Sequence, residues 1–474
     1  MERLSKKEGF GQRHFSEIYM CDAVKDHIPF NLPYHRSAVN MSLIRKDVKA
    51  FQNLNTTMPD CDFLKYAIAQ TRRDFHLSEP VKMIHLNDVF SIQDLNIWDS
   101  SPGLPWKNFG YRTKNEIRKD PEAIRRVRKF WHLVKSGKKL GPPDSLAYVR
   151  SHLAPIGEEK VRAVWGYPAT ITFGEAVFAL PLIKGYKNKV NSPIGYGYET
   201  AIGGFKKLME RFSGRPYFQT MDFKNFDKTV PAWLVEIAFN ILLDNLNLQD
   251  YEEYGVASVG KMLRMWRYIV DYFINTPIRL CNGERYMKHS GVASGSYFTQ
   301  LIDSVINAIL INWIHIKING HFPLDYLVMG DDSLVASNGR MDYDDAQDVF
   351  DEIGMQINFK KSAQSKYLNR LTFIGYQIGF GLPTKPIEEL YAALAFPERP
   401  DKCVEDLQNR ALGLIYAALG QDSHFHALCT AIIQFKSFDI IIPRHLMRMI
   451  SLVLGLEVKS TRPPTEMELL KRLL

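Results

Sequence analysis

Two adjacent aspartates, Asp331 and Asp332, follow Gly330 in the middle of a short apolar stretch. Apolar residues occupy 326–329 before them and 334–336 after them, a pattern that predicts a buried strand, a tight turn and a second buried strand. Neighbouring carboxylates at such a place repel each other and lose water, and a divalent cation such as Mg²⁺ removes that cost. The alternative is an ordinary surface turn, in which Asp and Gly are common residues.

A second acidic centre lies in the stretch 217–227. An apolar strand is predicted to end at Asp222, and Asp227 follows after the chain has left that strand. A carboxylate at the end of a neighbouring strand can reach a metal ion held by Asp331. We therefore expect Asp222 and Asp331 to share a cation site.

Lys160 and Arg162 alternate with valines in a pattern typical of a strand, so both side chains are expected to point to the same side. Two cations side by side repel each other unless an anion lies between them. A nucleoside triphosphate fits such a pair. Ion pairs with Glu158 or Glu159 are the alternative.

A long apolar helix is predicted after the flexible, glycine-containing loop 290–296. Thr299, Asp303 and Asn307 recur at every fourth residue of this helix, so they lie on one face. A line of polar groups on a buried helix is unfavourable unless it meets a ligand or other polar groups. This face is therefore a candidate binding surface.

Two further stretches could contact a phosphodiester backbone. The segment 100–106 is rich in Pro and Gly, which predicts a rigid loop with exposed amides, although a domain linker fits equally well. A helix is predicted over 120–137, and its outer faces carry cations. Arg125, Arg128 and Lys129 form either a surface that tracks phosphates or an ordinary solvated face.

The rest of the pattern mixes helices and strands. A helical region is expected over 231–273, and Asn282-Gly283 between extended runs predicts a hairpin. Residues 370–378 are expected to form a strand with a glycine bend, and the chain is mostly helical from about 383.

The composition is that of a folded globular protein, with 474 residues of which 46% are hydrophobic and 24% charged. A net charge of +8 and a pI near 9.0 favour a polyanionic partner such as nucleic acid. The five cysteines are scattered and odd in number, which favours a reducing, intracellular setting. No uninterrupted apolar run reaches membrane-spanning length and no signal peptide is recognisable, so no membrane partner is expected.

In type and order these motifs resemble those of viral RNA-dependent RNA polymerases. The likeness covers roughly residues 100–380 and is greatest to the polymerases of partitiviruses, which have double-stranded RNA genomes, with picobirnavirus polymerases next. The resemblance implies that Asp222 and Asp331 are metal ligands, with Asp332 as a weaker ligand. It also implies that Asp227 senses the ribose 2′-hydroxyl.

The resemblance assigns roles to further residues. Ser294, Gly295 and Thr299 match the loop and helix that hold the template and the incoming ribose, and Lys361 resembles a lysine proposed as general acid for pyrophosphate. Other carried-over positions are the triphosphate-binding Lys160 and Arg162, and the template-guiding Ser101 and Gly103. Two alternatives stay open: Lys360 for the general acid, and either Asp303 or Asn307 for the ribose contact.

The fold that the resemblance implies is α+β, a right hand with a small antiparallel palm sheet packed on helices. We expect an N-terminal extension with a fingertip region over 1–98 and fingers over 99–215. The palm is expected over 216–380, with a finger insertion at about 236–289, and the thumb over 381–474.

The activity that follows is template-directed RNA synthesis from ribonucleoside triphosphates, using two Mg²⁺ ions, with Mn²⁺ as a substitute. The enzyme would replicate and transcribe a viral RNA genome, with template and product RNA as partners and the viral capsid protein beside it. The setting would be the virion interior or the host cytoplasm. A metal-dependent nuclease and a non-catalytic RNA-packaging protein are the alternatives.

Overall fold

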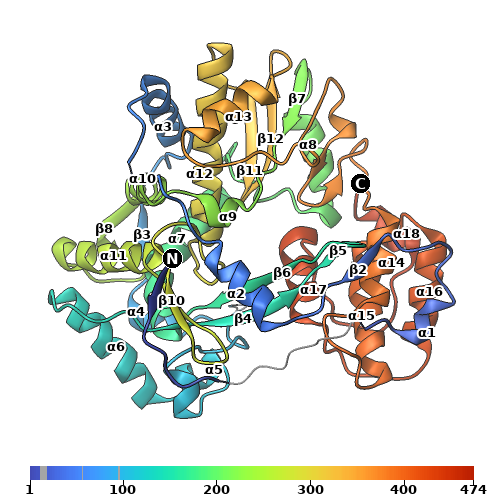
Figure 1. The fold of residues 1–474 in the computed structure, drawn as a ribbon, viewed down its shortest axis with the longest axis horizontal. Coiled ribbons are helices and arrows are strands. Elements are labelled where there is room, and N and C mark those ends of the chain that lie inside the picture. The colour runs from blue at the N-terminus through green and yellow to red at the C-terminus, as the bar shows by residue number, and fades with distance from the viewer. Residues whose placement is uncertain (11–18, 56, 94, 96) are drawn as a thin grey trace.

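The computed structural model describes residues 1–10, 19–55, 57–93, 95 and 97–474. These residues form a mixture of helices and mostly antiparallel strands, which is compatible with the predicted α+β class. Figure 1 shows a four-stranded sheet at the top, long strands of a second sheet across the middle and a group of C-terminal helices at the right.

The four-stranded sheet is antiparallel and carries the acidic residues. Its order is β11 (Asp325–Met329), β12 (Asp332–Ser337), β7 (Tyr217–Thr220) and β13 (Ala363–Ser365). Met329 pairs with Asp332, so Gly330 and Asp331 form a two-residue turn, in which Gly330 adopts a φ of 66°. The predicted strand, turn and strand are confirmed.

The hairpin β11–β12 separates two cores, because successive side chains of a strand point to opposite faces. Val328 and Val335 join a large core with α12 (Thr299–Ile314) and α13 (Tyr343–Asp351). Leu327 and Leu334 join a second core with α8 (Gly204–Arg211) and the C-terminal helices. Because both faces of this hairpin are buried, the runs 326–329 and 334–336 are apolar throughout and do not alternate with polar residues.

The second sheet has five strands in the order β1 (Glu2–Leu4), β10 (Arg285–Met287), β9 (Pro277–Arg279), β4 (Ser145–Ser151) and β6 (Val161–Gly166). All neighbours are antiparallel except β4 and β9. The hairpin predicted at Asn282-Gly283 is confirmed as β9–β10. The strand β6 forms one edge of this sheet.

The prediction of continuous helix over 231–273 is wrong in its middle. The chain forms α10 (Ala232–Leu243), then β8 (Leu246–Tyr251), then α11 (Val259–Ile274). The strand β8 exists because it pairs with β3 (Val81–Met83), a partner far away in the sequence.

The single strand predicted over 370–378 is also corrected. The chain forms a small hairpin of β14 (Thr372–Phe373) and β15 (Tyr376–Gln377). It turns at Ile374 and Gly375, which have φ values of 45° and 79°.

The N-terminal segment runs across several parts of the molecule. Its strand β2 (Tyr34–Arg36) pairs with β5 (Leu153–Pro155), and its helices are α1 (Asp22–Lys25), α2 (Met41–Lys49), α3 (Asp62–Asp74) and α4 (Leu86–Val89). Next come η1 (Trp106–Phe109), α5 (Lys114–Lys119), α6 (Pro121–Lys135), α7 (Ala169–Asn188) and η2 (Thr200–Ile202). As predicted, α6 starts at Asp120, whose side chain accepts hydrogen bonds from the first free amides of the helix.

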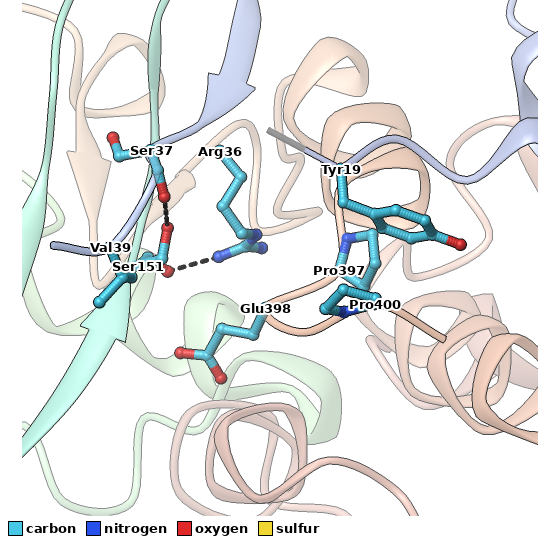
Figure 2. Close-up of a pocket in the computed structure, with 8 residues that line it drawn as sticks. All are labelled: Tyr19, Arg36, Ser37, Val39, Ser151, Pro397, Glu398 and Pro400. Carbon is cyan, nitrogen blue, oxygen red and sulfur yellow. Dashed lines mark hydrogen bonds between the residues drawn. The ribbon is translucent and has the colours of Figure 1, made fainter. Parts of the chain in front are cut away.

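The C-terminal region is helical, as predicted. It comprises α14 (Ile387–Ala395), α15 (Val404–Ala417), α16 (Ser423–Gln434), α17 (Arg444–Arg448), η5 (Met449–Leu454) and α18 (Glu466–Lys471). Where this region meets the N-terminal segment, the Arg36 guanidinium donates to the carbonyls of Phe396 (2.7 Å) and Ser151 (2.5 Å). Figure 2 shows this junction beside a cavity of about 20 Å³, which has room for about one water molecule.

One helix of the described residues, Thr299–Asn319, has the length and composition of a membrane span. Inside the protein, 83% of its most apolar window is buried. It packs against α3 and α10 and has the surroundings of a core helix.

Candidate active site

The turn between β11 and β12 presents Asp331 and Asp332, which are exposed to solvent although protein atoms lie close around the turn. Burial raises the pKa of Asp331 above the ordinary value, and the Asp222 charge adds to the rise while Arg162 opposes it. Burial also raises the pKa of Asp332, and repulsion from the charges of Asp331 and Asp222 raises it further. The acids from β7 and from the turn are thus close enough to act on one another.

The helix α12 holds this turn in place. Its Ser304 hydroxyl accepts a hydrogen bond from the Gly330 amide at 2.9 Å. The Asn307 amide group donates to the carbonyls of Gly330 (3.1 Å) and Asp332 (3.2 Å). The sequence pattern does not identify Ser304, although this residue directly follows Asp303 in the chain.

Asp222 lies two residues beyond the end of β7 and is fixed by the turn 358–362. The Asn358 side chain donates to Asp222 Oδ1 at 2.7 Å, and the Asp222 amide donates to the Ser362 hydroxyl at 3.0 Å. The same turn carries the exposed Lys361, whose charge acts on Asp331 and Asp332. Sequence reasoning found the lysine but gave Asn358 and Ser362 no role.

Lys160 and Arg162 approach the acids from the edge strand β6. Burial lowers the pKa of Lys160, and Arg162 and Lys361 lower it further, while the Asp222 charge opposes them. The charge of Arg162 also lowers the pKa of Asp331. In the described part of the chain, neither cation forms an ion pair with Glu158 or Glu159, so the alternative reading of these cations finds no support.

A second group of acids lies behind the turn. Asp227 lies on α9 (Phe226–Thr229) and Asp303 on α12, and burial raises the pKa of both carboxyls. The charges of Asp331 and Asp227 raise the pKa of Asp303 further. Among the described residues, Asp303 Oδ1 has no hydrogen-bond partner.

The loop 290–296 is docked onto the end of β6. The Trp165 amide donates to the Ser294 hydroxyl at 3.2 Å, and a Cβ added to Gly295 would lie 1.8 Å from the Trp165 carbonyl oxygen. At the end of the loop the buried Glu175 accepts from the Ser296 hydroxyl (2.7 Å) and the Tyr297 amide (3.0 Å). Burial raises the pKa of Glu175 to about 7.

Thr299, the first residue of α12, turns back to this loop, and its hydroxyl donates to the Ala293 carbonyl at 2.6 Å. The sequence pattern does not single out Glu175, because its hydrogen-bond partners lie more than a hundred residues away in the chain.

Other predicted residues are not brought to the acidic turn. The Ser101 hydroxyl bonds to that of Tyr148 at 2.6 Å, and Gly103, with a φ of 66°, packs against Tyr167. The exposed cations of α6 lie at the lower left of Figure 1, at the opposite side of the molecule from β11 and β12. These cations are Arg125, Arg128 and Lys129, of which Arg125 pairs with Glu122 at 2.6 Å.

The donor chemistry of the acidic turn suits Mg²⁺, which prefers carboxylate oxygens and binds few protein groups. The raised pKa values of Asp331 and Asp332 reflect a repulsion that a divalent cation would relieve. As the side chains stand, no three His, Cys, Asp or Glu residues of the described ranges converge closely enough to chelate an ion. Any ion held here would therefore depend on further ligands such as substrate phosphates.

Residues 31–387 match the family model of the viral RNA-dependent RNA polymerases, and the chain belongs to this family. The right-hand polymerase fold is implied by that membership. The RNA-directed RNA polymerase of Atkinsonella hypoxylon virus is 27% identical over 60% of this chain and 50% of its own length. That of Cryptosporidium parvum virus 1 is 28% identical over 67% of this chain and 62% of its own length.

The match extends to the non-structural polyprotein 1AB of human astrovirus-5, which is 26% identical over 77% of this chain and 26% of its own length. The matched part of the chain thus covers 50% of the length of the Atkinsonella hypoxylon virus polymerase and 62% of that of Cryptosporidium parvum virus 1. The predicted likeness to viral polymerases of the partitivirus type is confirmed.

Proposed function

We propose that the protein synthesises RNA on an RNA template from ribonucleoside triphosphates, and thereby replicates and transcribes a viral double-stranded RNA genome. The observation that carries the proposal is that Asp222, just beyond β7, and Asp331, in the turn between β11 and β12, act on one another, with Lys160, Arg162 and Lys361 around them. Acids that can hold a metal ion, facing cations that can hold phosphates, form the charge pattern that a metal-bound triphosphate requires.

In the proposed reaction, the 3′-hydroxyl of the product strand attacks the α-phosphate of the nucleotide and pyrophosphate leaves. Mg²⁺ ions, two in the proposal and replaceable by Mn²⁺, would be held by Asp222 and Asp331, with Asp332 as a weaker ligand, and would stabilise the charge on the attacking and leaving oxygens. Lys160 and Arg162 bind the triphosphate, and Lys361 gives its proton to the leaving pyrophosphate.

The ribose contact is assigned to Asp303 with Asp227. Both hydrogens of the Asn307 amide already point to the carbonyls of the turn, so this side chain keeps only its Oδ1, which can accept a hydrogen bond but not donate one. Asp303 keeps an oxygen without a partner among the described residues and lies next to Asp227. The carboxyl oxygens of Asp303 and Asp227 can accept a hydrogen bond from a 2′-hydroxyl, which a deoxyribose lacks.

The proposed domains are an N-terminal extension (1–98), fingers (99–215), a palm (216–380, with a finger insertion at about 236–289) and a thumb (381–474). The four-stranded sheet then belongs to the palm and the C-terminal helices to the thumb.

The proposed RNA path takes in the template-guiding loop and the loop 290–296 near the reaction centre. The α6 cations would contact the template strand at a distance from the chemistry. The residues of this path are Ser101, Gly103, Ser294, Gly295, Thr299, Arg125, Arg128 and Lys129. The viral capsid protein is the proposed partner, and the virion interior and the host cytoplasm are the proposed settings.

The test is an extension assay with a labelled primer on an RNA template, Mg²⁺ and all four nucleotides, with each nucleotide omitted in turn. We expect extension to stop at the position of the omitted nucleotide. Asp331→Ala should lower the rate at least about a hundredfold. The matched control is Asp345→Asn, which changes an exposed aspartate on α13 and should leave the rate unchanged.

Two outcomes would contradict the proposal. Shortening of the RNA when nucleotides are absent would favour a nuclease. RNA binding without any nucleotide-dependent product would favour a packaging protein.

A further inference from the structure

Asp47 is a buried acid outside the proposed catalytic set. It lies on α2, and both carboxylate oxygens are used: Oδ2 accepts from the Ala163 amide at 2.7 Å, and Oδ1 pairs with the Lys228 ammonium group. The side chains of Asp47 and Lys228 are 7% and 8% exposed, so the pair is shielded from solvent. In Figure 1, α2 lies between α9 and the strands β4 and β6.

The two bonds of Asp47 reach the two sides of the proposed nucleotide site. Ala163 follows Arg162 on β6, whose free edge leaves alternate amides without a strand partner. Asp47 satisfies one of these amides, and Ser294 satisfies the next at Trp165. Lys228 directly follows Asp227, whose carboxyl feels the Lys228 charge.

The segment after α2 strengthens these connections. The Phe51 ring packs edge-on against Trp165, with ring centroids 4.9 Å apart. The Asn53 amide donates to the Ser290 hydroxyl at 3.1 Å, and the Asn53 side chain donates to the carbonyls of Thr229 and Ile353. One N-terminal segment thus holds the strand of Arg162, the helix of Asp227 and the loop of Ser294.

Stability alone gives no reason for this ion pair, because well-packed apolar residues often stabilise a core as well as a buried pair does. An unpaired ammonium group beside Asp227, however, would draw its carboxylate away from the ribose. We propose that Asp47 is a positioning residue of the nucleotide site, which neutralises Lys228 and thereby leaves Asp227 free to recognise the ribose 2′-hydroxyl. This inference rests on the proposed function.

The test compares the binding of UTP and dUTP to the full chain by calorimetric titration, with Ca²⁺ as the metal ion so that no turnover occurs. Asp47→Asn keeps an oxygen for the Ala163 amide and removes only the charge. We expect the preference of the protein for UTP over dUTP to fall about tenfold, the effect of losing one hydrogen bond to a charged group. In the double variant with Lys228→Met, the preference should return to within about twofold of the wild type, because the uncompensated charge is gone.

The control is Asp401→Asn, which breaks the buried pair of Asp401 with Arg410 among the C-terminal helices. It should lower Tm without changing the UTP preference. An unchanged preference in Asp47→Asn would overturn the inference, because Asp47 would then act only on stability. A double variant that fails to recover would overturn it too, because Asp47 would then not act through the charge of Lys228. A wild-type protein that makes no RNA would instead refute the proposed function, and the titration would still decide the role of Asp47.

Discussion

The adjacent lysines Lys360 and Lys361 differ in their electrostatic effect on the aspartates of the turn. Both are exposed on the turn that fixes Asp222. The charge of Lys361 opposes the rise in pKa of Asp331 and Asp332, whereas Lys360 acts on neither acid. This difference supports the role proposed for Lys361 over that of Lys360.

Lys361→Gln should lower kcat by about a hundredfold, the lower end of what a positioned general acid contributes. Lys360→Gln is the matched control and should retain kcat within about twofold of the wild type. Single-turnover extension of a primed template measures both. Equal losses in the two variants would show that the turn supplies only general positive charge.

The raised pKa values of Asp331 and Asp332 predict a pH dependence of stability. A carboxyl whose pKa is raised on folding stabilises the fold below its unfolded pKa, and this contribution is lost as pH rises through the folded pKa. In EDTA, Tm of the wild type should therefore fall from about pH 4 upward, and that of Asp332→Asn should fall less. Adding Mg²⁺ at pH 8 should raise Tm of the wild type more than that of the variant.

Thermal scans of both proteins across this pH range measure the effect, and the difference between the two curves removes the contribution of other buried acids such as Glu175. Identical curves would mean that the two aspartates do not repel each other in the folded protein.

The positions of Asp331 and Asp222 beside the ends of buried strands could be predicted from the sequence, because each follows a short apolar run. The hydrogen bonds of Asp47, Glu175 and Asn358 could not be predicted, because their partners lie more than a hundred residues away in the chain. The hydrogen bonds of Asn307 to the turn could not be predicted either, because they depend on how the turn packs against the helix.

The helix α12 combines two tasks on one face. Asn307 and Ser304 hold the backbone of the turn, and Asp303, one helical turn before Asn307, faces the acids Asp227 and Asp331. The regular spacing predicted a common face. The hydrogen bonds divide this face into a part that holds the turn and a part that we propose contacts the ribose.

Two substitutions on α12 should separate these tasks. Asn307→Ala leaves the carbonyls of Gly330 and Asp332 without their donor, so it should lower stability by about 1–3 kcal/mol and lower kcat for UTP and dUTP alike. Asp303→Ala should instead lower the ratio of kcat/KM for UTP to that for dUTP about tenfold. Steady-state incorporation and thermal unfolding give both quantities. A loss of discrimination in Asn307→Ala would reverse the assignment.

At the scale of the whole molecule, the N-terminal segment connects regions that are distant in the sequence. Arg36 bonds to the backbone of β4 and to Phe396 near the start of the C-terminal helices, while Glu398 pairs with Arg150 at 3.1 Å and with His445 at 3.1 Å. These bonds connect the proposed fingers and thumb, and Figure 2 shows the bond from Arg36 to Ser151.

Arg36→Met should loosen this junction, because the carbonyls of Ser151 and Phe396 lose a charged donor while the apolar volume is kept. We expect a loss of about 2–4 kcal/mol in the free energy of unfolding and faster cleavage near 396–403 by a protease. Lys402→Gln, an exposed change beside the same segment, is the control. Equal cleavage rates in the wild type and Arg36→Met would show that the junction is held by other contacts.

The order of helices and strands in the middle of the chain could be read from the pattern of apolar residues, as for the hairpins β11–β12 and β9–β10. The strand β8 could not, because it depends on pairing with β3, and the same holds for the pairing of β1 with β10. Strand pairing across long separations is a property of the packed molecule, and the local sequence carries little trace of it.

The pairing of β1 with β10 bears on how the protein is made. Residues 2–4 leave the ribosome well before their partner residues 285–287 have been synthesised. Until then the first strand has no sheet to join, and the nascent chain carries an unmatched edge. Completion of the five-stranded sheet is therefore a late event of translation, and a chaperone that shields such an edge would act during this interval.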